Sequence, residues 1–233
     1  MNRGYDFELF TKYLSIVQLL NTTHRTQYCI ADIVSEEDYE KVKHFPLGKT
    51  PSFMAEKDVE YLVAEKQIPI AGKNVLDIGF GDGEFMNVLA EQGANVFGFD
   101  IDKPVNADLI SGTIFTMPVE KMPKELWGTF DTAINFRAMD LSNFGFTNTT
   151  FDSVTRACVR ALKKSGIYVG TLIDEQVIFK GGKPIVTPDG RPFVNALRKY
   201  FKTLELEKAL HGPNNKTAMF IAQEPREQFL FSK

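Results

Sequence analysis

The chain has 233 residues, 43% of them hydrophobic and 24% charged, which suits one sizeable globular domain with a small appendage. Its formal charge of −3 gives no general attraction for nucleic acid, and its apolar runs are too short to cross a bilayer. An acid stands where a secretion signal would have its apolar centre and only two cysteines are present, so we expect a cytoplasmic protein that is not inserted in a membrane.

The opening segment is predicted to be mostly helical. After Asp6, a plausible cap, apolar residues recur at spacings of three and four. Ser35 begins a second, more charged helix, and a third runs from near Ser52 through VEYLVAEK. We therefore divide the chain into a helical N-terminal segment, residues 1–70, and a main domain, residues 71–233.

From residue 74 onward the sequence alternates between strand and helix patterns. Five strands are predicted, in NVLDIG, ANVFGFDID, the weaker ADLI, FDTAINF and GIYVGTLID. The intervening helices include GEFMNVLAEQG and TTFDSVTRACVRALKKSG, with Gly93 and Gly166 at their ends. This alternation predicts an α/β fold with a doubly wound, mostly parallel sheet that binds ligands at the carboxyl ends of its strands.

The last third departs from that alternation. FVNALRKYF predicts a helix, and TLELEKAL and TAMFIAQE predict an antiparallel strand pair joined through the turn HGPNNK. The pair brings the predicted sheet to seven strands. An insertion at about residues 174–191 contains two short apolar runs split by Gly181 and Gly182, which predicts a small hairpin.

The stretch VLDIGFGDGEF carries the strongest chemical signal. Gly79, Gly81 and Gly83 form G-x-G-x-G, which differs from the G-x-G-x-x-G typical of dinucleotide sites. Asp77 precedes this turn and Asp82 lies inside it, and two carboxylates would repel a pyrophosphate by a few kcal/mol. The turn therefore favours a ligand with an ammonium group and no phosphate, although Asp77 as a simple turn or capping acid is the alternative.

Asp100 ends the second predicted strand, where an acid can accept hydrogen bonds from both hydroxyls of a ribose. The alternative for Asp100 is a solvated strand-end acid. Together the two motifs indicate an adenosine-like ribose joined to a cationic amino acid end.

At this point the sequence resembles the class I, Rossmann-like S-adenosylmethionine-dependent methyltransferases. The resemblance runs from about Lys73 to Glu224 and rests on VLDIGFGDGEF, VFGFDID, SGTIFTMP, FDTAINF and LKKSGIYVGTL. It implies S-adenosyl-L-methionine as cofactor. Asp77 and the turn from Gly79 to Gly83, including Phe80 and Asp82, would hold its amino acid end.

The resemblance also places the rest of the cofactor. It implies Asp100 on the ribose and Ile101 against the adenine. Many members carry an acid after the third strand that contacts the adenine amino group, and here Thr113, followed by Ile114, takes that place. Phe80, Phe99 and Phe136 either line the cofactor cleft or serve as ordinary core packing.

The fourth strand ends in INFRAMD, and in this family the residues beyond it face the transferring methyl group. Asn135 and Phe136 are best placed by position. Asp140 is a candidate base, Arg137 a candidate anchor for an acidic acceptor, and Met139 a candidate substrate contact. A surface Arg and a helix-capping Asp are the competing interpretations.

The helical N-terminal segment is a candidate lid over the cleft, with Tyr5, Tyr13, Phe53 and Met54 as candidate pocket-wall residues. The alternative is that these helices only pack on the sheet's edge. No histidine or cysteine pair has metal-ligand spacing, so we predict no metal site.

We therefore expect methyl transfer to an oxygen or nitrogen atom of a small-molecule metabolite. Three alternatives stay open: a cyclase or lyase that releases methylthioadenosine, a nucleic-acid methyltransferase, and a non-catalytic cofactor-binding protein. Nucleic acid is disfavoured as a partner, because the motifs of amino-directed and base-carbon enzymes are missing from this sequence and no basic stripe interleaved with aromatics is evident. The pattern specifies no oligomeric state.

Overall fold

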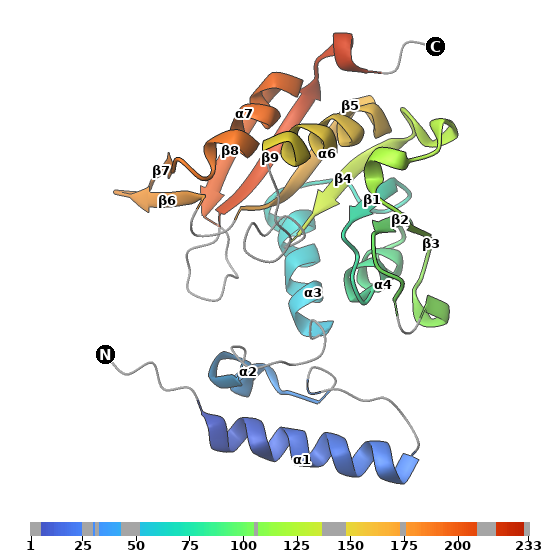
Figure 1. The fold of residues 1–233 in the computed structure, drawn as a ribbon, viewed down its shortest axis with the longest axis vertical. Coiled ribbons are helices and arrows are strands. Elements are labelled where there is room, and N and C mark those ends of the chain that lie inside the picture. Colours follow the sequence, from blue (N-terminus) through green and yellow to red (C-terminus); the bar gives the residue numbers. More distant parts are fainter. Residues whose placement is uncertain are drawn as a thin grey trace.

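A computed structural model of the chain describes residues 6–24, 30, 33–42, 52–104, 107–136, 148–172, 176–208 and 218–230. Its centre is a seven-stranded sheet with the order β3-β2-β1-β4-β5-β9-β8 (Figure 1). The strands are β1 Asn74–Ile78, β2 Asn95–Asp100, β3 Thr113–Thr116, β4 Phe130–Asn135, β5 Leu162–Leu172, β8 Phe201–Lys208 and β9 Ala218–Pro225.

The sheet is parallel from β3 to β5, and β9 runs antiparallel to both of its neighbours, β5 and β8. The predicted doubly wound, mostly parallel sheet with its terminal antiparallel pair is confirmed. Strands buried on both faces need long apolar runs, and four consecutive residues at the end of β1 are buried accordingly.

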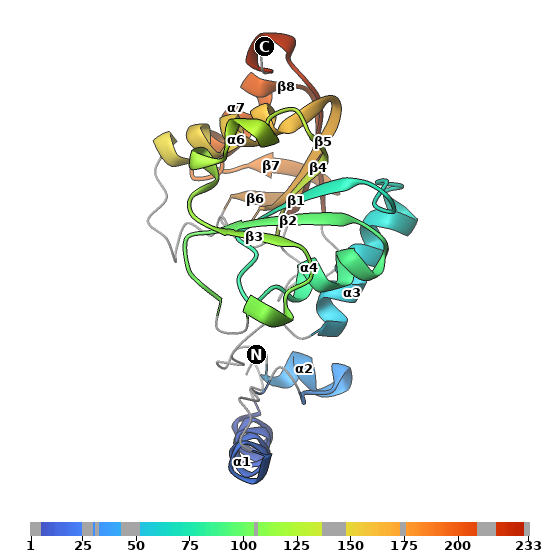
Figure 2. The same ribbon diagram turned by 90° about the vertical axis from the view of Figure 1, so that its right-hand side faces the viewer.

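Helices cover both faces of the sheet (Figure 2). On one face, α6 (Asn148–Ala161) and α7 (Arg191–Tyr200) pack with the sheet in a core that includes Phe130, Phe151, Phe193 and Phe220. On the other, α3 (Ser52–Glu60), its π-helical continuation Tyr61–Glu65 and α4 (Glu84–Glu91) form a second core that includes Leu62, Met86, Leu89 and Ile134.

The first two helices, α1 (Phe7–His24) and α2 (Glu36–Val42), have a small core of their own, separate from the sheet (Figure 1). The predicted caps hold both helices: Asp6 Oδ1 accepts from the Leu9 amide at 2.8 Å, and Ser35 Oγ accepts from the Asp38 amide at 3.2 Å. α3 connects this small core to the sheet, because Phe53 packs against the α1–α2 core whereas Ala55 and Val59 belong to the second sheet core.

Two sequence-based boundaries were wrong. ADLI is not a strand, because Ala107–Leu109 forms a 3-10 turn and the third strand is Thr113–Thr116, whose Thr, Ile and Phe residues suit a pleated surface. The helix predicted to run to Gly166 ends at Ala161, because Leu162 pairs with Phe130 and already belongs to β5. Long-range pairing overrides local helix propensity there.

The insertion forms the predicted hairpin, β6 (Val177–Lys180) against β7 (Lys183–Val186). Gly181 and Gly182 between the strands have φ values of 56° and 76°, as a two-residue primed turn requires. The remaining turns are 3-10 helices at Val119–Lys121, Lys124–Leu126 and Glu227–Phe229. Within the described ranges, no helix is both long and apolar enough to span a bilayer.

Candidate active site

Three adjacent strands bring the predicted residues to one edge of the sheet. The order β2-β1-β4 places the ends of these strands side by side, with Ile78 level with Phe99 and Asp77 level with Ile134. Asp100 ends β2, the glycine turn follows β1, and Asn135 ends β4. The carboxyl ends of parallel strands are where open α/β sheets bind ligands.

The glycine turn needs its glycines for two different reasons. Gly79, Gly81 and Gly83 have φ values of 74°, 55° and 83°, in a region that side chains disfavour. A Cβ on Gly83 would lie 2.5 Å from the Ile110 side chain, whereas a Cβ on Gly81 would meet nothing within 4 Å. Gly83 is therefore a packing position, and Gly81 faces open space that a ligand can enter.

Asp77 lies beneath this turn and is 3% exposed. Its Oδ2 atom has no hydrogen-bond partner among the described residues. Burial, followed by the negative charges of Asp100 and Asp82, raises the pKa of Asp77 to about 7. A buried acid with an unpaired oxygen calls for a cationic donor, and the same group of carboxylates repels a pyrophosphate.

Asp100 is held by backbone groups at the end of β2. Its Oδ2 accepts from the Gly81 amide at 2.9 Å and its Oδ1 from the Asp102 amide at 3.0 Å. A carboxylate offers about four acceptor positions, so two remain for a pair of vicinal hydroxyls. The next residue, Ile101, is 60% exposed, which leaves a bare apolar side chain beside that position.

The structure does not support the adenine assignment of Thr113 and Ile114. Thr113 begins β3 level with Phe97, at the opposite end of the strand from the site, and Ile114 packs against the second core. The residue level with Asp100 is Thr116. The misplaced third strand caused this error, and the β-branched and aromatic residues of TIFT are the signal that would have corrected it.

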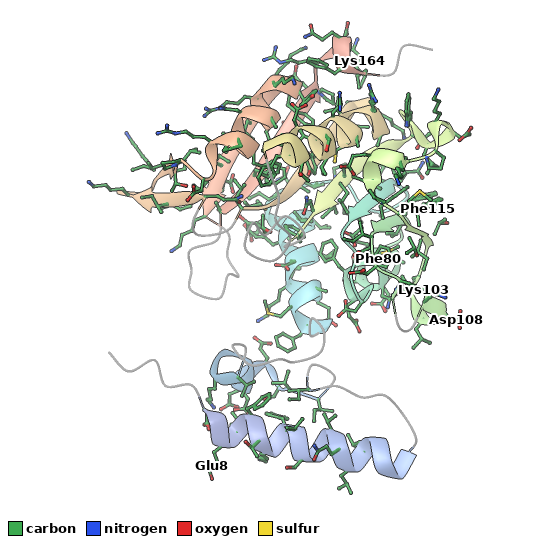
Figure 3. All side chains as sticks on the ribbon, viewed as in Figure 1. Glu8, Phe80, Lys103, Asp108, Phe115 and Lys164 are labelled. Carbon is green, nitrogen blue, oxygen red and sulfur yellow. The ribbon has the colours of Figure 1, made fainter. Side chains whose placement is uncertain are left out.

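The aromatic candidates are core residues. Phe80 is buried in the second core, where a Cβ on Gly98 would lie 2.7 Å from its ring. Figure 3 labels it together with Lys103 and Asp108, whose side chains are exposed. Phe99 is also buried and stacks on Phe115 with ring centroids 4.6 Å apart. Of the three, Phe80 and Phe99 serve as packing.

Phe136 is half-buried at the end of β4, with its ring edge-to-face with Phe85 at 5.1 Å. Asp82 has a local role, since its Oδ1 accepts from the Glu84 amide at 3.3 Å at the start of α4. Both residues therefore have structural contacts of their own, and their contact with the cofactor stays a prediction.

Asn135 is 1% exposed, and its Nδ2 donates to the Tyr168 hydroxyl on β5 at 3.2 Å. Its Oδ1 atom has no hydrogen-bond partner in the described part of the chain. Tyr168 was not among the sequence candidates. In sequence it is one apolar-strand residue among many, and only the register between β4 and β5 brings it beneath Asn135.

The other candidates lie away from this edge or outside the described ranges. Tyr13 donates to Asp38 at 2.9 Å and, with Phe53, belongs to the small α1–α2 core. Met54 is buried on α3. The remaining four, Tyr5, Arg137, Met139 and Asp140, fall outside the described residues. No group of three or more His, Cys, Asp or Glu side chains within the described ranges could hold a metal ion.

The sheet order, the open glycine turn and the strand-end acids define a Rossmann-like domain built for a nucleoside ligand that lacks a pyrophosphate. Residues 76–170 match a family model described as a methyltransferase domain. Over these residues the chain is therefore similar to methyltransferase domains.

The chain is also similar to curated relatives and to solved structures. The chain is 26% identical over 157 residues to ubiquinone biosynthesis O-methyltransferases of Coxiella burnetii, a match that covers 67% of this chain and 57% of the relative. The match therefore spans little more than half the length of these relatives. The PH0226 protein of Pyrococcus horikoshii has a similar fold, with a TM-score of 0.58 and 18% identity over 83% of this chain and all of that one.

A Burkholderia thailandensis 1,6-didemethyltoxoflavin-N1-methyltransferase, solved with 1,6-didemethyltoxoflavin and S-adenosylhomocysteine, is similar over 94% of this chain and 90% of its own. Its TM-score is 0.54 and its identity 15%, so the likeness concerns the fold.

The residues present fit S-adenosylmethionine, the cofactor that the sequence resemblance implies. Asp77 has an unpaired oxygen suited to an ammonium group, Gly81 leaves room above the turn, and Asp100 keeps acceptor capacity for a ribose.

Proposed function

We propose that the protein is an S-adenosylmethionine-dependent methyltransferase that methylates an oxygen or nitrogen atom of a small molecule. The observation that carries this proposal is the pair formed by the buried, partly unpaired carboxylate of Asp77 and the backbone-held carboxylate of Asp100, on either side of an open glycine turn. The names of the relatives support the acceptor class, since they describe an O-methyltransferase and an N-methyltransferase of a small heterocycle.

Each residue has a defined task in this proposal. Asp77 pairs with the cofactor's ammonium group, and Asp100 binds the ribose hydroxyls beside Ile101. The bound cofactor supplies an electrophilic methyl group on a sulfonium, so the protein mainly has to position the two reactants in line. Asn135 and Phe136 lie nearest the expected path of the methyl group. Arg137 and Asp140 stay predictions for the acceptor anchor and the proton acceptor.

We also propose a lid over the cleft, formed by α1 and α2 rather than by the whole of residues 1–70. Among the described helices, α1 and α2 pack apart from the sheet and form the proposed cap, and α3 joins them to it through Phe53 on one side and Val59 on the other. We expect removal of residues 1–30 to lower turnover more than it lowers affinity for S-adenosylhomocysteine. Equal loss of both would favour helices that merely support the fold. A cytoplasmic location is also proposed, in keeping with a buried free thiol at Cys158.

One experiment separates the alternatives. The purified protein is incubated with S-adenosylmethionine, with and without a panel of phenols and heterocyclic amines, and the nucleoside product is identified. We expect S-adenosylhomocysteine that forms only when an acceptor is present. Methylthioadenosine without an acceptor would instead indicate a cyclase or lyase, and tight binding without any product would indicate a cofactor-binding protein.

An Asp100→Ala variant tests the ribose assignment, with Asp108→Asn as its matched control. It should lose turnover through weaker cofactor binding, because ribose hydroxyls would lose their acceptor. An Asp108→Asn variant, whose carboxyl is exposed on the 3-10 turn after β2, should behave as the wild type.

A further inference from the structure

The carboxamide of Asn135 is tied to a buried hydroxyl that the proposed function does not use. Asn135 Nδ2 donates to Tyr168 Oη at 3.2 Å, and Asn135 and Tyr168 are 1% and 0% exposed. In the register between β4 and β5, Asn135 is level with Gly170 and Tyr168 is level with Ala133. The hydrogen bond therefore runs diagonally between neighbouring strands, from the site edge toward the core.

The buried thiol of Cys158 on α6 is a second hydrogen-bond partner of the Tyr168 hydroxyl. Burial raises the pKa of Cys158 to about 12 and that of Tyr168 well above its usual value, so both groups keep their protons at neutral pH. The Tyr168 oxygen accepts from Asn135 Nδ2.

The backbone of Asn135 is closely packed, so the orientation of its side-chain carboxamide depends on the hydrogen bond to Tyr168. A Cβ on Gly170 would lie 2.3 Å from the Asn135 carbonyl oxygen, so the two strands are in close contact there. The following ring, Phe136, packs against Phe85. With Nδ2 held by Tyr168, the amide's Oδ1 points away from that bond and has no partner among the described residues. A buried acceptor left without a donor destabilises the fold until a ligand supplies the donor.

We propose that Tyr168 is a positioning residue that fixes the Asn135 carboxamide so that Oδ1 is presented to a proton-bearing nitrogen or oxygen of a ligand bound at the end of β4. The inference rests on the proposed function for the identity of that ligand. Two sources carry this chemistry: the ammonium group of the cofactor and the nucleophilic group of the methyl acceptor.

The link between Tyr168 and Asn135 can be tested without activity. In ¹⁵N spectra of the full-length protein, the side-chain amide signals of Asn135 are assigned by their loss in Asn135→Ala. Tyr168→Phe should move them, because one amide proton loses its hydrogen bond. Tyr200→Phe is the matched control, since Tyr200 is also buried and donates to Asp152 at 3.0 Å on a different part of α6. It should leave the Asn135 signals in place.

A double-mutant cycle then tests whether Tyr168 acts through Asn135. Affinity for S-adenosylhomocysteine, and kcat and KM with an acceptor from the panel above, are measured for Tyr168→Phe, Asn135→Ala and the double variant. Loss of one ordering hydrogen bond should change one of these quantities by about three- to tenfold. That loss should be absent in the Asn135→Ala background. Weaker binding of S-adenosylhomocysteine assigns the donor to the cofactor, and a lower kcat with unchanged binding assigns it to the acceptor.

The outcomes separate the two proposals. Unmoved Asn135 signals in Tyr168→Phe, additive effects of the two substitutions, or no effect on either binding or turnover overturn the positioning role. A wild type that forms no methylated product overturns the proposed function. The role of Tyr168 is then still decided by the Asn135 amide signals and by the double-mutant cycle on affinity for S-adenosylhomocysteine.

Discussion

Asp77 should make the unliganded protein less stable as pH rises. Its folded pKa of about 7 lies above the reference value of 3.8, so between these two values the folded state binds more protons than the unfolded state. The free energy of unfolding therefore falls as pH increases through that window. At about 1.4 kcal/mol per pKa unit, burial of Asp77 costs the fold about 4 kcal/mol at pH 8, where the carboxyl is ionised, and about 2 kcal/mol at pH 5, where folding has to protonate it.

Replacing Asp77 with Asn removes the charge and keeps the shape. The buried amide should cost about 1–2 kcal/mol through its unpaired N–H groups. The variant should therefore be more stable than the wild type by about 2 kcal/mol at pH 8, or about 5 °C in Tm for a chain of this size, and nearly equal to it at pH 5. Thermal unfolding of both proteins at the two pH values, without cofactor, measures this difference.

The Asp108→Asn control should show no change at either pH. A stability gain that is the same at pH 5 and pH 8, or an Asp77→Asn variant that is less stable at pH 8, would refute the reasoning. The gain should come with a loss of function, because the carboxylate is the proposed partner of the cofactor's ammonium group. Affinity for S-adenosylhomocysteine should rise with pH from about 6 to 8 in the wild type and stay flat in the variant.

Three further substitutions probe the same edge of the sheet. Asp100→Ala should weaken S-adenosylhomocysteine binding by about 1–3 kcal/mol in calorimetry, and unchanged affinity would exclude the ribose assignment. Gly83→Ala should lower Tm clearly, because its methyl group would overlap Ile110 at a positive φ, and an unchanged Tm would contradict that packing. Gly81→Ala should cost only about 1 kcal/mol of stability but weaken cofactor binding more strongly than that, since its methyl group enters the open space above the turn; full affinity would place the ligand elsewhere.

The sequence predicted what depends on local pattern. Composition and spacing within a few residues predict the strand that contains Asp77, the turn glycines, and the caps at Asp6 and Ser35. The structure confirms those elements. The last strand pair was also predictable, because TLELEK alternates, AMFIA is a strand-length apolar run, and a turn-rich segment joins them.

What failed depended on pairing between distant segments. The helix predicted through Leu162 lost its last turns to β5, because Leu162 pairs with Phe130 and Lys163 forms an ion pair with Asp131 at 2.8 Å. The misplaced third strand shifted the adenine assignment to Thr113. Tyr168 was missed for the same reason, since nothing near it in sequence signals that its hydroxyl meets Asn135.

The position of β9 in the sheet has a consequence for how the protein is made. β9 comes after β8 in the chain but lies between β5 and β8, so β5 and β8 never pair with one another. Until residues 218–225 have left the ribosome, β5 keeps an unpaired edge and β8 has no place in the sheet. The site residues are all earlier in the chain, so the sheet that carries them is completed only by this late segment. A ribosome that stalls near residue 210 would leave a nascent chain whose β5 edge is unpaired and prone to aggregation, beside an otherwise assembled cofactor site.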